Sequence, residues 1–139
     1  MLALVDTCIW SLALRRQSKE LTATESALRE ELRELIDEGR ARLAGPIRQE
    51  ILSGIREASQ YERLREHLRA FPDEPLPVGD YELAAKLSNR CRSAGIAGSP
   101  VDFLICAVAL SRKWAIFTVD GDFEAYSRLL GITLHAPRG

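Results

Sequence analysis

The sequence predicts an α/β domain with three layers, in which helices cover both faces of a mostly parallel sheet. Two short apolar runs, residues 2–5 and 115–119, suit strands that are buried on both faces. Helical spacing of apolar residues fills most of the chain between them. Strands that alternate with helices form βα units with right-handed crossovers, and these connections make the strands parallel.

The composition is that of one globular domain, and we expect residues 1–139 to form it. Apolar residues make up 46% of the chain and charged residues 28%, which excludes a disordered chain. The net charge of -1 gives no overall basic field, so a nucleic-acid partner needs a local basic patch. No stretch is apolar for long enough to cross a bilayer, and the start of the chain does not resemble a signal peptide. We expect a cytoplasmic protein with no membrane partner.

The N-terminal part of the chain is predicted to alternate short strands with helices. Residues 2–5 form the first strand, and Thr24 is the expected N-cap of a helix that ends at Gly39. Pro46 suits the first turn of a later helix. The other elements expected here are helices at 7–14, 47–55 and 59–70 and a short strand at 42–44.

The C-terminal part begins with a proline-rich connector, residues 71–77, and an edge strand is expected around residues 76–78. Asp80 is the expected N-cap of a helix that ends near Gly95. Residues 99–102 begin a helix that is apolar through much of its length, which predicts burial against the sheet. The last expected elements are a strand at 115–119, a turn with Asp122 as N-cap, a helix at 123–130 and a strand at 132–134.

Four carboxylates stand where parallel strands bring them together. Asp6 follows the first strand, and Asp120 follows the strand that ends at Val119. Glu50 and Asp102 lie in the first turns of helices that follow loops at the same edge of the sheet. Ligands of open α/β sheets bind in the crevice outside the carboxyl ends of the strands. We therefore expect these four side chains to converge.

Each carboxylate also has a structural explanation of its own. Asp6 suits a helix N-cap, Glu50 and Asp102 suit the positive ends of helix dipoles, and Asp120 suits a turn. Stability alone does not favour the whole cluster, because neighbouring carboxylates repel and raise each other's pKa values. A divalent cation removes this conflict, and oxygen ligands select Mg²⁺ or Mn²⁺ rather than zinc. The cluster therefore predicts metal-dependent hydrolysis of phosphodiester bonds by water.

Other chemistries find little support in the sequence. No C-x-x-C pair occurs, so Cys8, Cys91 and Cys106 predict buried, reduced thiols rather than a zinc site or a disulfide. His67 falls in a charged helix and His135 near the end of the sequence, and both are expected at the surface. Neither a dinucleotide-binding nor a P-loop motif occurs. No histidine lies near Cys8 in sequence, which argues against a thiol nucleophile.

Four motifs in this order and spacing resemble those of a PIN domain, and within that superfamily those of the VapC toxins of prokaryotic toxin–antitoxin pairs. They are residues 4–7 (LVDT), 47–51 (IRQEI), 100–107 (PVDFLICA) and 118–123 (TVDGDF). Trp10 matches a common companion of the first motif. The resemblance covers essentially the whole chain. Cys8 departs from it, since the family often has Ser or Asn there and a thiol is a poor hydrogen-bond partner.

The resemblance implies a five-stranded parallel sheet of order 3-2-1-4-5 and a Mg²⁺- or Mn²⁺-dependent endoribonuclease. It implies catalytic and metal-binding roles for Asp6, Glu50, Asp102 and Asp120, of which Asp6 and Asp102 are the expected direct ligands. Glu50 and Asp120 are expected to bind a second ion or to hold metal-bound water. The residues expected to support the site are Thr7, Thr118 and Asp122, with Asp122 ranked below Asp120.

The resemblance also implies partners: a VapB-like antitoxin, an RNA substrate (tRNA, mRNA or rRNA) and a second copy of the chain. Helices between residues 24 and 70 are expected to supply the partner surfaces. Candidates for RNA contacts are Arg48, Arg56, Arg63 and Arg65, although arginines on a charged helix more often form a solvated face. Two alternatives remain open from the sequence. One is a PIN-like module that binds its partner and regulates their operon with little catalysis, and the other is a DNA-directed nuclease.

Overall fold

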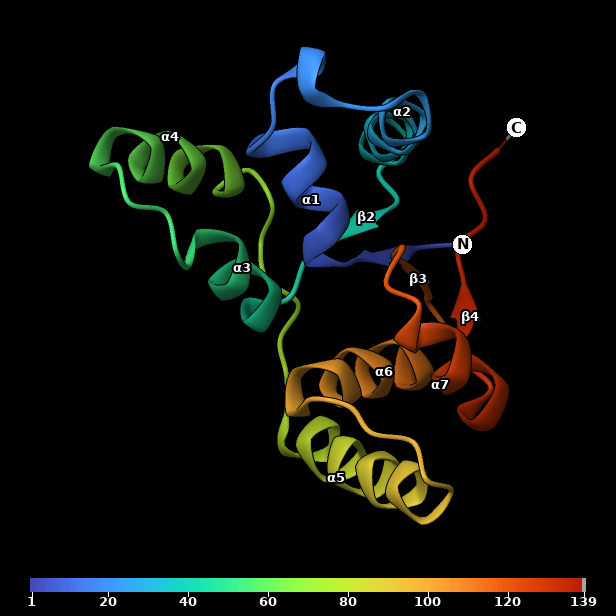
Figure 1. Cartoon of the computed structure of the whole chain (residues 1–139). Helices are drawn as coiled ribbons and strands as arrows, with labels where there is room; N and C mark the ends of the chain where they lie inside the picture. Colours follow the sequence, from blue (N-terminus) through green and yellow to red (C-terminus); the bar gives the residue numbers. More distant parts are fainter. Residues whose placement is uncertain (139) are drawn as a thin grey trace.

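The computed structural model describes residues 1–138, which form a parallel sheet between two groups of helices (Figure 1). The sheet has the strand order β2-β1-β3-β4, and every neighbouring pair of strands is parallel. The strands are β1 (Ala3–Val5), β2 (Ala41–Arg42), β3 (Ala115–Phe117) and β4 (Thr133–Leu134). The prediction of an α/β fold with a parallel sheet is confirmed.

Within residues 1–138, seven α-helices pack on the sheet, with α1, α2 and α4 on one side and α5, α6 and α7 on the other (Figure 1). They are α1 (Thr7–Leu14), α2 (Ala23–Asp37), α3 (Gly45–Leu52), α4 (Ala58–Leu68), α5 (Val78–Ser93), α6 (Pro100–Arg112) and α7 (Asp122–Leu130). A short 3₁₀ helix, η1 (Ser18–Glu20), precedes α2. Within residues 1–138 no helix combines the length and the apolar character needed to span a membrane.

Strand β1 lies in the middle of the sheet and is completely buried. Leu4 pairs with Arg42 on one side and with Ile116 on the other, and Val5 pairs with Phe117. An apolar strand with two strand neighbours and helices on both faces is typical of a parallel sheet. Because β1 and β3 are in register, the residues that follow them leave the sheet at the same edge. The backbone N–H of Asp6 donates to the carbonyl oxygen of Phe117 at 2.9 Å.

The expected fifth strand is present only as an isolated parallel bridge between Leu43 and Asp73, beside β2. The N–H of Glu74 donates to the carbonyl of Leu43 at 2.9 Å, and the pairing extends no further. The edge strand expected around residues 76–78 is wrong, because Val78 begins α5. Prolines at positions 72, 75 and 77 remove the N–H donors that a longer ladder would need.

Two predicted helix starts were misplaced by one or two residues. Thr22, not Thr24, is the N-cap of α2, since its side chain and that of Glu25 form a reciprocal capping box. Gly121, not Asp122, precedes α7, so Asp122 is the first residue of that helix. The other boundaries also moved: the second strand is Ala41–Arg42, α3 ends at Leu52, and α4 spans Ala58–Leu68.

Asp80 is not an N-cap but a buried member of an ion-pair network. It lies in the first turn of α5, and its carboxylate accepts two hydrogen bonds from Arg112 of α6, at 2.9 and 3.0 Å. Hydrogen bonds from Arg112 lower the pKa of Asp80 against the opposing effect of its burial. Arg112 also binds Glu74 at 2.7 Å, which fixes the connector to the helix pair α5–α6.

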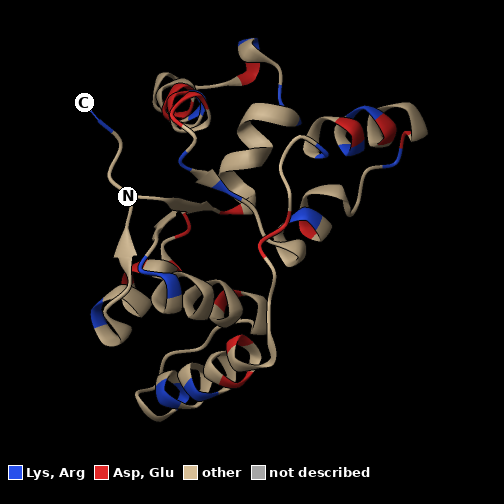
Figure 2. Ribbon diagram, turned by 180° about the vertical axis from the view of Figure 1, so that it is seen from behind, with Lys and Arg blue, Asp and Glu red and all other residues tan. Residues whose placement is uncertain are grey.

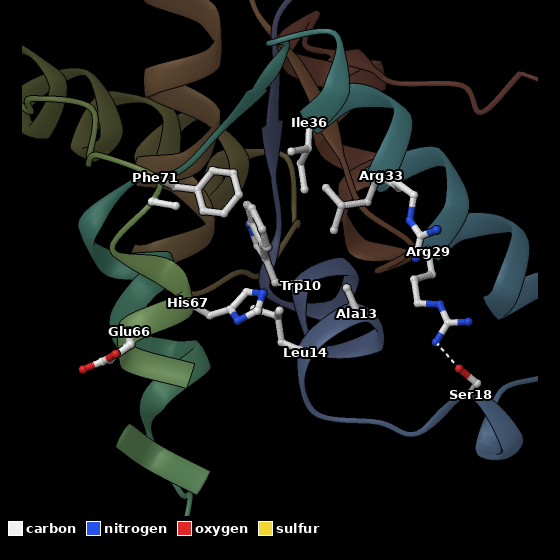
Figure 3. A pocket seen from close by; sticks show the side chains of 12 residues that line it. Trp10, Ala13, Leu14, Ser18, Arg29, Arg33, Ile36, Glu66, His67 and Phe71 are labelled. Carbon is white, nitrogen blue, oxygen red and sulfur yellow. Dashed lines mark hydrogen bonds between the residues drawn. The ribbon is translucent and has the colours of Figure 1, made fainter. Parts of the chain in front are cut away.

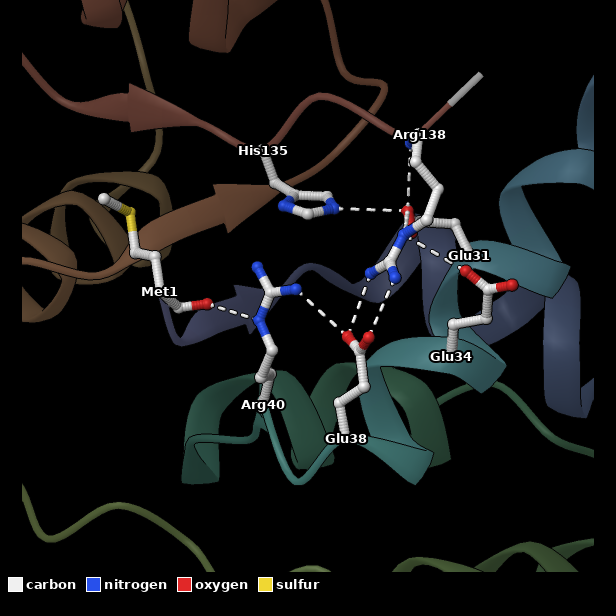
Figure 4. Close-up of polar contacts among 7 residues, drawn as sticks. All are labelled: Met1, Glu31, Glu34, Glu38, Arg40, His135 and Arg138. Atoms are coloured by element: carbon white, nitrogen blue, oxygen red, sulfur yellow. Dashed lines mark hydrogen bonds and ion pairs between the residues drawn. The ribbon is translucent and has the colours of Figure 1, made fainter.

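The C-terminal segment is fastened to α2 by charged side chains (Figure 4). Arg138 donates to Oε1 of the buried Glu31 at 2.7 Å and to both carboxylate oxygens of Glu38 at 2.8 and 2.9 Å. The expectation that His135 lies at the surface is wrong. Its side chain is only 10% exposed, its ring packs on Phe117, and its Nε2 lies 3.5 Å from Glu31.

Candidate metal centre

Asp6 is held rigidly where β1 meets α1. It is the N-cap of α1, and its Oδ1 accepts the backbone N–H of Thr7 at 2.8 Å. Its Oδ2 accepts the hydroxyl of Thr118, which follows β3, also at 2.8 Å. The residue is 8% exposed, so its carboxylate is mostly removed from water. Asp6 is therefore both the N-cap of α1 and a member of the acidic group at the edge of the sheet.

Glu50 reaches the same edge from α3. The sequence begins this helix with Pro46 in the first turn, where the missing N–H of proline costs nothing. The hydroxyl of Thr7 donates to Oε1 of Glu50 at 3.2 Å. Thr7 thus touches two of the expected site residues, through its N–H to Asp6 and through its hydroxyl to Glu50.

Asp102 enters from α6, in the first turn after the N-cap Ser99. The hydroxyl of Ser99 accepts the N–H of Asp102 at 3.1 Å, which fixes the backbone of the helix start. Oδ2 of Asp102 accepts the hydroxyl of Tyr126 from α7 at 3.0 Å. Ser99 therefore caps the helix as the pattern Ser99-x-x-Asp102 predicts, while the side chain of Asp102 binds Tyr126 rather than the start of its own helix.

Asp120 and Asp122 lie on the turn after β3 and complete the acidic group. The N–H of Asp120 donates to the Thr118 hydroxyl at 3.0 Å, and Oδ1 of Asp120 accepts the N–H of Asp122 at 3.0 Å. Asp102, Asp120 and Asp122 each offer a carboxylate oxygen, and these oxygens lie within 4.8 Å of one another. Seen from behind, the acidic segments at the end of β1 and after β3 lie near each other (Figure 2).

The carboxylates act on each other electrostatically. Burial raises the pKa of Asp6, and the charges of Asp102 and Asp120 raise it further against the hydrogen bonds from Thr118 and Thr7. Burial also raises the pKa of Glu50, with smaller contributions from Asp6 and Asp102. Among residues 1–138, no Lys, Arg or His forms an ion pair with any of these carboxylates. The negative charge of the group is thus uncompensated by the protein.

The donor set suits a hard divalent cation. The acidic group at this edge offers carboxylate oxygens, with hydroxyls from Thr7 and Thr118 and the thiol of Cys8 beside them. Mg²⁺ and Mn²⁺ prefer oxygen ligands of this kind, whereas zinc favours Cys and His. Asp102, Asp120 and Asp122 present the closest group of ligand atoms, and Asp6 lies deeper, at the end of β1.

Comparison with protein families decides the relationship: a sequence profile described as PIN domain matches residues 3–129. The chain belongs to the PIN-domain family. PIN domains are generally nucleases that use divalent metal ions, which agrees with the acidic group found here. No curated protein matches the sequence of this PIN domain significantly.

Solved structures share the whole fold of this PIN domain. The crystal structure of FitAcB from Neisseria gonorrhoeae contains a chain 21% identical, with 98% of each chain covered and a TM-score of 0.73. The structure of VapBC-1 from nontypeable Haemophilus influenzae contains one 14% identical, with 97% of each chain covered and a TM-score of 0.69. VapBC2 from Rickettsia felis, bound to a DNA fragment from their promoter, gives 14% identity, 97% and 98% coverage and a TM-score of 0.70. At these identities the likeness establishes the fold.

Cys8, the departure from the family pattern, lies against the site as a weak hydrogen-bonding group. Its Sγ is 3.8 Å from Oδ2 of Asp6 and 3.5 Å from the hydroxyl oxygen of Thr118. Burial raises the pKa of the Cys8 thiol, which keeps it protonated at neutral pH. A protonated thiol donates weakly to Asp6, while Thr118 supplies the stronger bond to the same oxygen.

The guanidinium of Arg48, a candidate for RNA contact, is engaged within the protein. It binds Asp73 at 2.8 Å and donates to the carbonyl oxygens of Leu68 and Phe71. Arg65 pairs with Glu62 of its own helix at 2.7 Å. Such an exposed pair does not prevent a contact with another molecule, since its net free energy is small.

Tyr126 is the residue near the site that the sequence analysis missed. It occupies the apolar face of α7, where spacing alone makes it a core residue. Its ring is completely buried, and its hydroxyl binds Asp102. The sequence contains one chemical indication of this contact, because a tyrosine at a buried position needs a polar partner for its hydroxyl.

A cavity between α1, α2 and α4 lies away from the carboxylates (Figure 3). It measures about 590 Å³, and Trp10 and Phe71 form its apolar floor with Ile36 and Leu14. Arg29, Arg33 and His67 lie at its edges in the same view. A second cavity of about 420 Å³ adjoins it and is lined by Arg15, Arg16, Arg63 and His67, among others.

Proposed function

We propose that this PIN domain is a Mg²⁺- or Mn²⁺-dependent endoribonuclease and the toxin of a VapBC-type toxin–antitoxin pair. One observation carries the proposal: carboxylates from four different parts of the chain meet at one sheet edge without a basic partner among residues 1–138. These carboxylates repel one another, and a module that only binds a partner gains nothing from that repulsion. A divalent cation would compensate it.

The proposed roles follow from the contacts of each carboxylate. Asp6 and Asp102 would bind the ion directly, since each has one oxygen held by a hydroxyl, from Thr118 and Tyr126 respectively. Glu50 and Asp120 would hold a second ion or water molecules. Thr7 orients Glu50, and Asp122 adds a carboxylate beside Asp120. A bound Mg²⁺ or Mn²⁺ supplies charge neutralisation at the phosphodiester and a water ligand of lowered pKa.

RNA is the substrate that we propose, in the cytoplasm where tRNA, mRNA and rRNA are available. The resemblance to VapC toxins favours RNA over DNA. The second cavity supports a phosphate-binding surface, because Arg15, Arg16 and Arg63 line it together. Arginine binds phosphate through two parallel hydrogen bonds. The outward-facing Arg56, between α3 and α4, is a further contact candidate.

A VapB-like antitoxin is the proposed occupant of the cavity between α1, α2 and α4. The resemblance to VapC toxins favours this partner, and the similar chains from VapBC-1 and VapBC2 carry the same fold. The apolar floor with Trp10 and Phe71 suits an amphipathic segment, and Arg29 and Arg33 suit acidic side chains beside it. Binding there would leave the sheet edge within reach of a longer antitoxin segment.

A homodimer is proposed through the outer face of α5 and α6. Val78 and Tyr81 are 74% and 54% exposed, and Tyr81 lines a mainly apolar hollow of about 350 Å³. Large exposed apolar groups that lie together mark association surfaces. Light scattering of the purified chain and of a Tyr81→Glu variant tests this, with a dimer expected for the former and a monomer for the latter. A monomeric wild-type chain at micromolar concentration would contradict it.

The nuclease is tested by incubating the antitoxin-free protein with a pool of tRNA and mRNA, and separately with single- and double-stranded DNA. Parallel reactions contain Mg²⁺, Mn²⁺ or EDTA, and an Asp102→Asn variant serves as the control. We expect metal-dependent cutting of RNA that the variant loses. Cutting of DNA alone would make the protein a DNA-directed nuclease. A folded protein that cuts nothing with either metal would favour the binding module, and cutting that survives both EDTA and Asp102→Asn would contradict the site.

A further inference from the structure

Tyr126 is a completely buried tyrosine whose hydroxyl points at the acidic group. Its ring packs between Phe103 and Phe123, with ring centroids 5.3 and 5.1 Å away. The contact with Phe103 ties α7 to α6, and the contact with Phe123 lies within α7 itself. The hydroxyl at its tip therefore has a fixed place, 3.0 Å from Oδ2 of Asp102.

The hydroxyl has two acceptors within reach but only one proton. Besides Asp102, the carbonyl oxygen of Ala97 lies 3.3 Å away. A carboxylate at the shorter distance is the better acceptor, because a hydrogen bond to a charged group is stronger. Ala97 alone would satisfy a buried hydroxyl, so the fold does not require the contact with Asp102 for that purpose. The contact instead restrains a side chain that is otherwise free to rotate about its terminal torsion.

Gly98 provides the room for this contact. A Cβ at position 98 would overlap the hydroxyl oxygen of Tyr126 and the edge of the Phe103 ring. The backbone of Gly98 does not have a positive φ, so the missing side chain is a matter of space and not of conformation. The loop between α5 and α6 thus leaves room for the Tyr126 hydroxyl beside Asp102.

We infer that Tyr126 is a positioning residue that holds one oxygen of Asp102 and leaves the other for the divalent ion, with Gly98 as the gap that permits it. This inference rests on the proposed function, because it concerns the same metal centre. The outer partners of metal-binding carboxylates orient their ligands, and loss of one such partner weakens metal binding about ten- to a hundredfold. Thr118 plays the corresponding part for Asp6.

The test is Tyr126→Phe, which removes only the hydroxyl and keeps the packed ring. Calorimetric titration with Mn²⁺ alone should show a dissociation constant about ten- to a hundredfold higher than that of the wild-type protein. RNA cleavage should fall at low Mn²⁺ and return towards the wild-type rate at saturating Mn²⁺. Asp102→Asn, which loses the ligand itself, should not recover.

The matched control is Ser127→Ala, which removes a neighbouring hydroxyl of α7. Ser127 donates to the carbonyl of Ile132 at 2.7 Å and contacts none of the acidic residues. This variant should lower the melting temperature and leave Mn²⁺ affinity unchanged. Gly98→Ala should weaken Mn²⁺ binding in the wild-type background. Its additional loss should be smaller in the Tyr126→Phe background, where the overlap with the hydroxyl is gone and only the overlap with the Phe103 ring remains.

Two outcomes would overturn the inference in distinguishable ways. Equal Mn²⁺ affinities of the wild-type and Tyr126→Phe proteins would make the hydroxyl purely structural while leaving the metal centre intact. A wild-type protein that binds no Mn²⁺ would remove the proposed function and the positioning role together. A uniform fall in cleavage that saturating Mn²⁺ does not recover would also contradict the positioning role.

Discussion

The hydroxyl of Thr118 donates to Oδ2 of Asp6 at 2.8 Å, across the gap between the ends of β3 and β1. The same hydroxyl oxygen accepts the N–H of Asp120 at 3.0 Å. One side chain therefore fixes the position of a carboxylate on the first strand and the start of the turn that carries two more. The register of β1 with β3 makes this possible, because Val5 pairs with Phe117 and the next residues face each other.

Thr118→Val should disrupt the metal centre without unfolding the protein. Valine keeps the shape of threonine but neither donates to Asp6 nor accepts from Asp120. We expect Mn²⁺ affinity and cleavage to fall about ten- to a hundredfold, as for other losses of an outer partner. Calorimetry and the cleavage assay measure both effects. Thr118→Ser keeps the hydroxyl and should stay close to wild type, and an equally impaired serine variant would refute the hydrogen-bonding role.

Glu50→Gln should stabilise the metal-free protein at neutral pH. The folded state raises the pKa of Glu50, first through burial and then through the charges of Asp6 and Asp102. A raised pKa means that the ionised carboxylate disfavours the folded state at a pH above the folded pKa. Glutamine removes the charge and still accepts from Thr7. The melting temperature at pH 7 in EDTA should therefore rise.

The pH dependence gives that prediction its control. As the pH falls below the unfolded pKa of 4.5, Glu50 is protonated in both states and the advantage of Glu50→Gln should vanish. Glu82→Gln, at an exposed position of α5, should show no such gain. With added Mn²⁺, the wild-type protein should have the higher melting temperature, because Mn²⁺ stabilises it more than it stabilises Glu50→Gln. A melting temperature that drops in Glu50→Gln at pH 7 without metal would argue against uncompensated charge.

Arg138→Ala should loosen the C-terminal segment, and the effect should depend on pH. Hydrogen bonds from Arg138 contribute most to lowering the pKa of Glu38 from 4.5 to about 2. A lowered pKa stabilises the folded state above pH 4.5, and this stabilisation is lost as the pH falls through 2. The difference in melting temperature between wild type and variant should shrink over that range. Lys86→Ala on α5 is the control, and a difference that does not depend on pH would contradict the ionic account.

Ala70→Arg should block the antitoxin cavity without touching the metal centre. Ala70 lines the cavity between α1, α2 and α4 and is exposed, so the protein should tolerate a long side chain there. The probe is the VapB-like antitoxin proposed above, co-expressed with this chain, and its affinity is measured by calorimetry. We expect at least a tenfold loss of affinity and unchanged RNA cleavage. Ala85→Arg, in the hollow on α5, should bind the antitoxin with the affinity of the wild-type protein. If Ala85→Arg lost affinity and Ala70→Arg kept it, the partner would bind at the face of α5 instead.

The sequence predicts those parts of the molecule that depend on apolar runs and on the ends of strands. The buried run at residues 3–5 has no other stable place than the middle of a sheet, and the acids after β1 and β3 follow from parallel connections. The fold class was therefore readable. The brevity of β2 and the reduction of the fifth strand to the Leu43–Asp73 bridge were not, because they depend on how prolines interrupt pairing between distant segments.

Contacts between side chains far apart in sequence account for what the sequence analysis missed. Arg48 resembles an exposed helix residue until the chain near Phe71 folds back over it and offers two carbonyl oxygens. His135 is covered because it packs on Phe117 of β3 and lies beside Glu31 of α2. Tyr126 meets Asp102 across two helices. Periodicity predicts which face of a helix is buried. It does not predict which polar group from another segment lies against that face.

The most direct test of the central claim is the anomalous difference map of a crystal soaked in Mn²⁺. The account predicts a peak at the sheet edge within direct ligand distance of carboxylate oxygens from Asp6 and Asp102. The peak should disappear in Asp102→Asn. A wild-type crystal with no peak at this edge at saturating Mn²⁺, or with its peak elsewhere on the chain, would contradict a metal-dependent nuclease centre here.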